Sequence, residues 1–351
     1  MATNAKGYAA QTAKAPLAPF SFQRRAVGPD DVSIKIAYCG VCHSDIHQAR
    51  DEWGGSLFPM VPGHEIVGHV TAVGPKVKKF KVGDTVGVGC MVDSCSKCPQ
   101  CKKGLEQYCV EGNTATYNSH TRDGKDITQG GYSDHIVVKE EFVLRVPSNL
   151  DLAAAAPLLC AGITTYSPLH HWGVKAGSKL GVVGLGGLGH MAVKIGKAMG
   201  AEITVFTTSE GKRDAAKKLG ADHVVLSKDA EQMKAVQNTL NVVIDTVGSA
   251  HDLTPYILAL TTDGVHILIG IPEKQHPPVP AALLIMNRKS VVGSLIGGIP
   301  ETQEMLDFCS KHGIVSDIEM IKADYINTAY ERVTKGDVKY RFVIDIASLD
   351  H

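Results

Sequence analysis

Apolar and polar residues alternate with a period of two through the first part of the chain. The segments VSIKIAYCG at 32–40 and IVGHVTAVG at 66–74 have the pattern of half-buried strands, with glycines at their breaks. KKFKVGDTVGV, at 78–88, predicts a hairpin that turns at Gly83. Residues 20–90 are therefore expected to form a β-rich, barrel-like sheet.

After Ser178 the pattern changes to short apolar runs separated by helical or loop segments. The first run, LGVVG, leads into the glycine turn Gly184-x-Gly186-x-x-Gly189 and then into a helix expected over 189–199. Four further runs follow: EITVF, DHVVL, NVVIDTVG and VHILIG. This alternation predicts a doubly wound parallel sheet with a phosphate-binding turn at the start of its first helix.

Helical and loop patterns fill most of the remaining chain. Asp151 is a suitable N-cap for an alanine-rich helix, and TQEMLDFCSKHG predicts a helix that stops at Gly313. IKADYINTAYERVTKG, at 321–336, predicts another helix, and YRFVIDI a closing strand. Residues 112–131, rich in Gly, Thr, Asn and Asp, predict a long surface loop.

A chain of 351 residues is too long for one ordinary core, so two domains are expected. The closing helices and strand return to the style of the first domain, which makes the parallel-sheet domain an insertion. We therefore place the first domain at 1–156 and 293–351, with a cysteine-rich lobe at about 90–112, and the second domain at 157–292.

The composition excludes several classes of partner. Apolar residues make up 44% and charged residues 21%, as in a globular protein, and 36 basic residues balance 36 acidic ones. No basic excess indicates nucleic acid, and no basic amphipathic stretch indicates a membrane surface. The N-terminus lacks the apolar block of a secretory signal, and the most apolar run, 153–163, is short and contains Pro157. We expect a cytoplasmic protein.

Four of the nine cysteines lie within fifteen residues, in the order C-x2-C-x2-C-x7-C. They are Cys95, Cys98, Cys101 and Cys109. Four thiolates can close tetrahedrally around one zinc ion and leave no open position, which is the arrangement of a structural site. An iron–sulfur cluster also takes four cysteines, so the spacing alone leaves both metals open.

A second set of candidate ligands is spread along the chain. Cys42 lies in CGVCHSDIH, and His64 and Glu65 lie in PGHE. A thiolate, an imidazole and a carboxylate form the borderline-soft set that zinc prefers. Cys160, in LLCAG, is the third ligand that an open catalytic site would need, although a free cysteine is also common in an apolar core.

The end of the second parallel strand bears on the choice of dinucleotide. A carboxylate there would bind the ribose hydroxyls of NAD. The residues present instead are Thr207, Thr208, Ser209, Lys212 and Arg213. Hydroxyls and cations suit a 2′-phosphate and predict NADP, with NAD less favoured; Glu210 keeps NAD open, and adjacent cations are also common on a solvated helix face.

These signals, in this order, resemble the zinc-dependent medium-chain alcohol dehydrogenases over nearly the whole chain. The motifs CGVCHSDIH, PGHEIVG, LLCAGITTY, GLGGLGH and YRFVID are most similar to the cinnamyl-alcohol-dehydrogenase-like branch. The resemblance implies an α/β protein with a GroES-like β-barrel catalytic domain and a Rossmann cofactor domain. It also implies two zinc ions per chain, NADP(H), a small aldehyde or alcohol substrate, and a homodimer formed near residues 291–298.

The resemblance also assigns roles to individual residues. It implies a catalytic zinc bound by Cys42, His64 and Cys160, with Glu65 beside it, and a structural zinc bound by Cys95, Cys98, Cys101 and Cys109. It places Ser44 next to the substrate oxygen, His47 at the solvent end of a proton relay, and Asp45 behind the ligand imidazole. The cofactor would contact His43, Thr164, Gly184, Gly186, Gly187, Leu188, Gly189, Thr207, Thr208, Ser209, Lys212 and Arg213. Trp53, Leu57 and Phe58 are placed to form an apolar substrate pocket, although core packing explains an aromatic residue there nearly as well.

The implied reaction is hydride transfer between NADPH and aromatic or medium-chain aldehydes, with primary alcohols as substrates in reverse. One alternative is an NAD-dependent polyol or secondary-alcohol dehydrogenase, which would more often carry a carboxylate after the second strand. A zinc-free quinone reductase is disfavoured by the seven candidate ligands. A catalytically inactive nucleotide-binding relative would usually have lost Cys42, His64 or Cys160.

Overall fold

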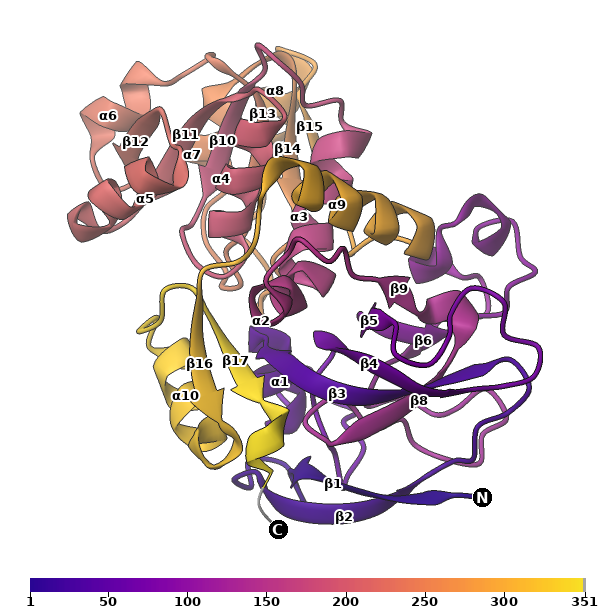
Figure 1. Ribbon diagram of the computed structural model, residues 1–351. Coiled ribbons are helices and arrows are strands. Elements are labelled where there is room, and N and C mark those ends of the chain that lie inside the picture. The colour runs from indigo at the N-terminus through magenta and orange to yellow at the C-terminus, as the bar shows by residue number, and fades with distance from the viewer. Residues whose placement is uncertain (350–351) are drawn as a thin grey trace. The chain divides into compact units, whose positions relative to one another are not determined.

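A computed structural model of the chain describes residues 1–349 and divides into two compact units (Figure 1). One unit comprises residues 1–160 together with the chain from Gly297 onward, and the other comprises residues 161–296. The closing part of the chain therefore belongs to the same unit as the N-terminal part.

The first unit is built on a seven-stranded sheet that is mostly antiparallel (Figure 1). Its central strand is β3, Asp31–Val41, which pairs antiparallel with β4 (Ile66–Val73), β8 (His135–Lys139) and β17 (Arg341–Asp345). The other members are β5 (Thr85–Val88), β9 (Leu144–Arg145) and β16 (Ile318–Lys322). The predicted closing strand is thus confirmed as β17.

Smaller elements surround this sheet. Two short antiparallel pairs are formed by β1 (Thr3–Ala9) with β2 (Ala18–Arg24) and by β6 (Met91–Asp93) with β7 (Thr114–Ala115). The helices are α1 (His43–Ala49), α2 (Leu152–Ala155), α9 (Ile299–His312) and α10 (Ile326–Thr334). Short 3-10 helices span Cys101–Lys103, Glu106–Tyr108, Glu140–Phe142, Ala156–Leu159, Ala323–Tyr325 and Ile346–Ser348.

Two predicted helix boundaries are confirmed. The Asp151 side chain caps α2 by accepting a hydrogen bond from the Ala154 N–H at 2.9 Å. Helix α9 ends at Gly313, whose φ of 63° is in the left-handed region that glycine adopts without strain.

Three local predictions were wrong. The first arm of the predicted hairpin, residues 78–82, is not a strand, because the N–H groups of Lys78 and Lys79 donate to the Glu140 side chain. The second arm forms β5, which pairs with β4. The predicted helix from 321 begins only at Ile326, because residues 321–322 pair with β17 as the end of β16 and Ala323–Tyr325 form a 3-10 turn. The segment 112–131 is not entirely a surface loop, since it contains β7 and the buried ring of Tyr117.

The second unit is a six-stranded, all-parallel sheet in the order β12-β11-β10-β13-β14-β15. Its strands are β10 (Lys179–Val183), β11 (Glu202–Thr207), β12 (His223–Leu226), β13 (Leu240–Asp245), β14 (Leu260–Leu268) and β15 (Ser290–Gly293). The strand order reverses between β10 and β13, as in Rossmann folds, where ligands bind at the carboxyl ends of the strands beside this reversal.

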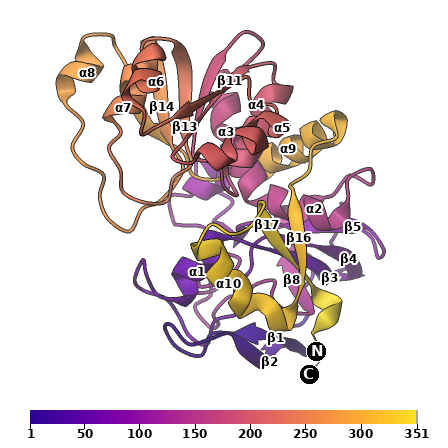
Figure 2. The same ribbon diagram turned by 90° about the vertical axis from the view of Figure 1, so that its left-hand side faces the viewer.

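Helices cover both faces of the parallel sheet. They are α3 (Ala161–His171), α4 (Gly189–Ala198), α5 (Arg213–Leu219), α6 (Ala230–Ala235), α7 (Thr254–Ala259) and α8 (Ala281–Ile285), with a 3-10 turn at Glu210–Lys212. Figure 2 shows α3, α4 and α5 gathered on one side and α6 and α7 on the other. Side chains from the strands themselves form part of the buried core, among them Phe206 of β11 and Leu240 and Val243 of β13.

Among residues 1–349, no single helix is long and apolar enough to cross a membrane. One bent pair of consecutive helices, Leu152–Leu159 with Ala161–His171, meets the criteria of length and composition only when the two are taken together.

Candidate active site

Two thiols, an imidazole and a carboxylate converge inside the first unit. Cys42 follows β3 at the start of α1, His64 and Glu65 precede β4, and Cys160 follows the 3-10 helix at 156–159. One ligand atom from each residue lies within 4.8 Å of the others, and all four residues are buried. The two sulfurs are 3.8 Å apart. Two thiolates and an imidazole are the ligand set of catalytic zinc sites, so the donor chemistry fits zinc.

Asp45 on α1 holds this cluster together from behind. Its fully buried carboxylate accepts hydrogen bonds from Cys42 N–H at 2.9 Å, Gly63 N–H at 3.3 Å and the Tyr132 hydroxyl at 3.0 Å. It also lies 3.1 Å from His64 Nδ1. Because an ionised carboxylate only accepts, Nδ1 carries the proton and Nε2 of His64 is left to bind a metal.

The ionisable groups of this cluster have pKa values that are shifted in different directions. A hydrogen bond with Cys160 lowers the pKa of Cys42 well below that of an ordinary thiol, and hydrogen bonds with Cys42 and Cys90 raise the pKa of Cys160. Burial lowers the pKa of His64, but the charges of Asp45 and Cys90 and the hydrogen bonds with Asp45 and Cys42 together outweigh burial, so the pKa is raised overall. A bound cation would displace the shared protons. Cys90, which the sequence did not single out, is a further thiol at this cluster.

Glu65 is tied to Arg341 on β17 in a buried ion pair. Among residues 1–349, Glu65 Oε2 and Arg341 Nε have no hydrogen-bond partner. Gly40 makes room for the carboxylate, because a Cβ at that position would collide with Glu65 Oε2. Arg341 lies within the YRFVID motif but was not predicted to have a role.

Ser44 and His47 lie on α1, immediately after Cys42. Ser44 Oγ is 3.6 Å from Cys42 Sγ. The His47 ring is stacked between His43 and Trp53, with 4.7 Å between ring centroids on each side. The stacked His47 side chain is 10% exposed.

Glu52 connects His47 with solvent. Its Oε2 lies 2.5 Å from His47 Nδ1, and its side chain is 25% exposed. The sequence analysis missed Glu52 because an acidic residue five positions after a histidine is not by itself distinctive. The turn that follows α1 brings the two side chains together.

The three predicted pocket residues lie in the segment between α1 and His64. Trp53 packs on His47, and its Nε1 is buried without a partner in the described part of the chain. Leu57 and Phe58 are half-buried, and the Leu57 N–H donates to Asn118 Oδ1 at 2.7 Å. This hydrogen bond ties the backbone of Leu57 to the 112–131 segment.

The four clustered cysteines form a second group of ligand atoms, again within 4.8 Å of one another. Sγ of Cys101 lies 3.4 Å from Sγ of Cys98 and 3.9 Å from Sγ of Cys95. The hydrogen bond from the Cys101 N–H lowers the pKa of Cys98 to about 6, whereas burial raises that of Cys101 to about 12. Four sulfurs around one point, with amide N–H groups directed at them, fit a closed metal site.

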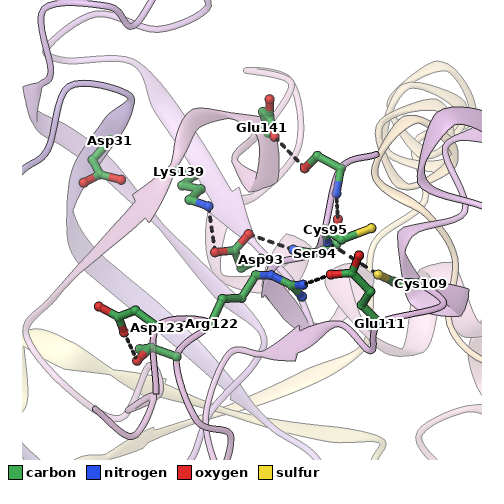
Figure 3. Close-up of polar contacts among 12 residues, drawn as sticks. Asp31, Asp93, Ser94, Cys95, Cys109, Glu111, Arg122, Asp123, Lys139 and Glu141 are labelled. Carbon is green, nitrogen blue, oxygen red and sulfur yellow. Dashed lines mark hydrogen bonds and ion pairs between the residues drawn. The ribbon is translucent and has the colours of Figure 1, made fainter. Parts of the chain in front are cut away.

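Polar contacts surround this cysteine lobe (Figure 3). Lys139 Nζ is 2.7 Å from Asp93 Oδ2, and the Cys95 N–H donates to Cys109 Sγ at 3.4 Å. On another side, the Glu106 carboxylate accepts from Ile299 N–H at 2.9 Å, at the N-terminus of α9. A negative side chain at a helix N-terminus is stabilised by the helix dipole, which helps to dock the lobe on α9.

The glycine turn of the second unit has the geometry of a phosphate-binding loop. Gly184 directly follows β10 with φ of +88°, and α4 begins at Gly189. A Cβ at Gly189 would collide with the Gly184 carbonyl oxygen, whereas one at Gly186 would meet nothing within 4 Å. Two glycines therefore close the turn, and Gly186 leaves open space beside the backbone, with Gly187 and Leu188 completing the turn.

Lys212 and Arg213 have different surroundings. Lys212 Nζ donates to the Leu185 carbonyl oxygen at 3.2 Å, so its charge lies over the glycine turn. Arg213 instead pairs with Glu210, with 2.6 Å between Nε and Oε1, and also donates to Val224 O. Of the two predicted cations, only Lys212 thus points to the turn. Glu210, the acidic residue that would have favoured NAD, is paired with Arg213.

The remaining predicted cofactor residues are divided between the two units. Thr207 ends β11, and its buried Oγ1 accepts from Ser209 N–H at 3.2 Å, while Thr208 is exposed. Thr164 lies in α3 with its buried Oγ1 unpartnered within residues 1–349. His43 lies in the first unit, on α1.

Comparison with known proteins agrees with this fold and this donor set. Residues 28–148 match the alcohol dehydrogenase GroES-like domain, and residues 187–311 match the zinc-binding dehydrogenase domain. An aldehyde reductase, YahK, of Escherichia coli is 57% identical over 345 residues, which cover 98% of this chain and 99% of that protein.

Two solved structures are similar over almost their whole length. The cinnamyl alcohol dehydrogenase of Sorghum bicolor is 48% identical, with a TM-score of 0.97 and coverage of 99% of this chain and 100% of that one. The Helicobacter pylori cinnamyl alcohol dehydrogenase complexed with NADP(H) is 46% identical, with a TM-score of 0.93 and coverage of 99% of each chain. The chain belongs to the zinc-binding alcohol dehydrogenases with a GroES-like domain, in the branch of the cinnamyl alcohol dehydrogenases.

Proposed function

We propose that the protein is an NADP-dependent zinc alcohol dehydrogenase that transfers a hydride between NADPH and aromatic or medium-chain aldehydes, and acts on primary alcohols in reverse. The observation that carries the proposal is the convergence of Cys42, His64 and Cys160, far apart in sequence, in one buried cluster. The aldehyde reductase and cinnamyl alcohol dehydrogenases to which the chain is similar support the substrate class.

Two groups of residues would hold zinc. Cys42, His64 and Cys160 would bind the catalytic ion, with Glu65 beside them held by Arg341. When bound there, zinc would supply a Lewis acid for the substrate oxygen. The structural ion would be bound by Cys95, Cys98, Cys101 and Cys109. The match to a zinc-binding family favours zinc over an iron–sulfur cluster in this lobe.

The chain's own residues would move the proton of the substrate hydroxyl. Ser44, beside the metal cluster, would exchange the proton with the substrate oxygen, and His47 would pass it on. Glu52 would complete the path, because it contacts His47 Nδ1 and is more exposed than the ring. Asp45 would keep the His64 ring in place. Trp53, Leu57 and Phe58 would form the apolar wall of the substrate pocket.

The second unit would bind the dinucleotide. The turn from Gly184 to Gly189 would receive the pyrophosphate at the start of α4. The 2′-phosphate would be bound by Thr207, Thr208, Ser209 and Lys212, with Arg213 contributing charge at longer range because Glu210 pairs with it. His43 would contact the pyrophosphate and Thr164 the nicotinamide end.

The test is a panel of aldehydes and alcohols assayed with NADPH and NADH on protein of measured zinc content. We expect about two zinc ions per chain and efficient NADPH-dependent reduction of aromatic aldehydes. Absence of hydride transfer from either cofactor in zinc-loaded protein would contradict the proposal.

An NAD-dependent polyol dehydrogenase is the alternative of the same fold. The Arg213–Glu210 pair counts against it, because it occupies the carboxylate that would otherwise be available for ribose hydroxyls. A higher efficiency with NADH on sorbitol-like substrates than with NADPH on aldehydes would favour this alternative.

We further propose a cytoplasmic homodimer with the two functional domains at 1–156 with 293–351 and at 157–292. Strand β15, which overlaps the predicted contact at 291–298, is an edge strand of its sheet, so its outer side is available for pairing. Light scattering would test the dimer.

A further inference from the structure

A buried carboxylate in the second unit holds two imidazoles at the end of β13. The side chain of Asp245 is 1% exposed, and its Oδ2 lies 2.9 Å from His251 Nε2 and 3.2 Å from His266 Nε2. His266 is on the neighbouring β14, whereas His251 is in the loop between β13 and α7. Oδ1 accepts from Val247 N–H at 3.1 Å. The carboxylate therefore anchors the loop to the sheet.

Both ring nitrogens of His251 face oxygen acceptors. Nε2 faces Asp245, and Nδ1 lies 2.8 Å from the carbonyl oxygen of Ser249. A neutral imidazole has one proton to donate and an imidazolium has two, so only the protonated ring donates to both oxygens. His266, by contrast, has a buried Nδ1 with no partner among residues 1–349, as expected of a neutral ring that donates from Nε2.

The electrostatic surroundings agree with a charged His251. The hydrogen bond with Asp245 raises the pKa of His251. Burial raises the pKa of Asp245, but the bonds to His251 and His266 outweigh it and lower the pKa to about 2. The other titratable neighbours are Asp252, whose charge also raises the pKa of His251, Tyr256 on α7, and His276, whose Nδ1 accepts from the His251 N–H at 3.3 Å.

The loop anchored in this way packs against the glycine turn. Thr246 donates to the Val183 carbonyl oxygen from its N–H at 3.1 Å and from its hydroxyl at 2.8 Å. A Cβ at Gly184 would lie 3.0 Å from both Thr246 Oγ1 and Val247 Cγ2, and one at Gly189 would lie 3.3 Å from the same hydroxyl. Two glycines of the fingerprint therefore border the loop.

We propose that the ion pair of Asp245 with protonated His251 positions residues 246–251 as a wall of the dinucleotide site and thereby sets the affinity for NADP(H). This inference rests on the proposed function, because it assigns a ligand to the glycine turn. Both residues act by positioning the loop. Since the pair exists only while His251 is protonated, the affinity is highest below the pKa of His251 and falls as the pH rises through it.

The test compares His251→Gln with the wild type. Glutamine retains one donor for Asp245 but has no charge and cannot also reach Ser249. The matched control is His223→Gln, because His223 makes the same type of contact with Glu202 at 2.9 Å but is exposed. The dissociation constant for NADPH is measured by fluorescence between about pH 6 and pH 9, together with kcat at saturating NADPH. Comparing variants at each pH cancels the titration of the 2′-phosphate itself.

We expect His251→Gln to weaken NADPH binding about tenfold at the acidic end, without lowering kcat, and to approach the wild type at the alkaline end. Asp245→Asn should bind NADPH as weakly as His251→Gln at each pH, which provides a second variant if the first fails to fold. Equal affinities of wild type and His251→Gln at every pH, or an equal loss in His223→Gln, would overturn the inference. Failure of the wild type to bind NADPH would overturn the proposed function instead.

Discussion

Tyr132→Phe removes one hydroxyl from the group of donors behind the metal cluster and nothing else. The ring is fully buried, and its hydroxyl donates to Asp45 Oδ2 at 3.0 Å. That carboxylate also contacts His64 Nδ1, which fixes the orientation of the proposed ligand ring. The substitution therefore tests whether the support of Asp45 reaches the metal.

The size of the effect follows from the number of donors to Asp45. The carboxylate receives four hydrogen bonds, from Cys42, Gly63, His64 and Tyr132, and loses one of them. A hydrogen bond to a charged group contributes about 1.5–3 kcal/mol, and changes behind a metal ligand weaken metal binding about 10–100-fold. Because three donors remain, we expect about a tenfold loss of zinc affinity, near the lower end of that range.

The assay is zinc retention against a rising concentration of chelator. In Tyr132→Phe one zinc per chain should be lost at about tenfold lower chelator concentration, while the other, in the cysteine lobe, is an internal reference. Tyr325→Phe, at an exposed position, is the matched control and should behave as the wild type. If Tyr132→Phe retained both ions like the wild type while losing stability, the hydroxyl would serve packing alone and the reasoning would be refuted.

Three further predictions follow from the contacts around the site. Arg341→Met leaves Glu65 buried without its partner and should lower the free energy of unfolding by about 3–5 kcal/mol in urea denaturation; an unchanged midpoint would contradict the buried ion pair. Glu52→Gln should lower kcat for alcohol oxidation near neutral pH about fivefold, and His47→Gln by at least as much, whereas an effect confined to His47 would remove Glu52 from the relay. Lys212→Ala should reduce the ratio of kcat/KM for NADPH to that for NADH by about tenfold or more, and an unchanged ratio would show that its charge does not read the 2′-phosphate.

Features that depend on neighbouring residues were predictable from the sequence. The turn at Gly184 follows from the glycine spacing between a strand and a helix, because steric freedom and hydrogen bonding there are local. The cysteine lobe was predictable for the same reason, since its four sulfurs lie within fifteen residues. The metal cluster around Cys42 was different, because its members are distant in sequence. Their residue types suggested zinc, and the resemblance to a family assigned them to one site.

Two of the missed contacts join residues that are distant in sequence. Tyr132 meets Asp45 across 87 positions, and Arg341 meets Glu65 across 276, so neither contact leaves a mark in local sequence. The false strand before Gly83 has the same origin, because the Glu140 side chain takes the amide hydrogen bonds that a strand would have used. The helix predicted from 321 included the last two residues of β16, whose parallel pairing with β17 outweighs local preference.

The central claim is that Cys42, His64 and Cys160 bind an ion that hydride transfer from NADPH requires. The most direct measurement is zinc content together with single-turnover NADPH oxidation by an aromatic aldehyde in Cys42→Ser. We expect about one zinc per chain in place of two, normal NADPH binding, and a rate lower by about a thousandfold or more. A variant that retained both ions, or that oxidised NADPH at the wild-type rate, would contradict it.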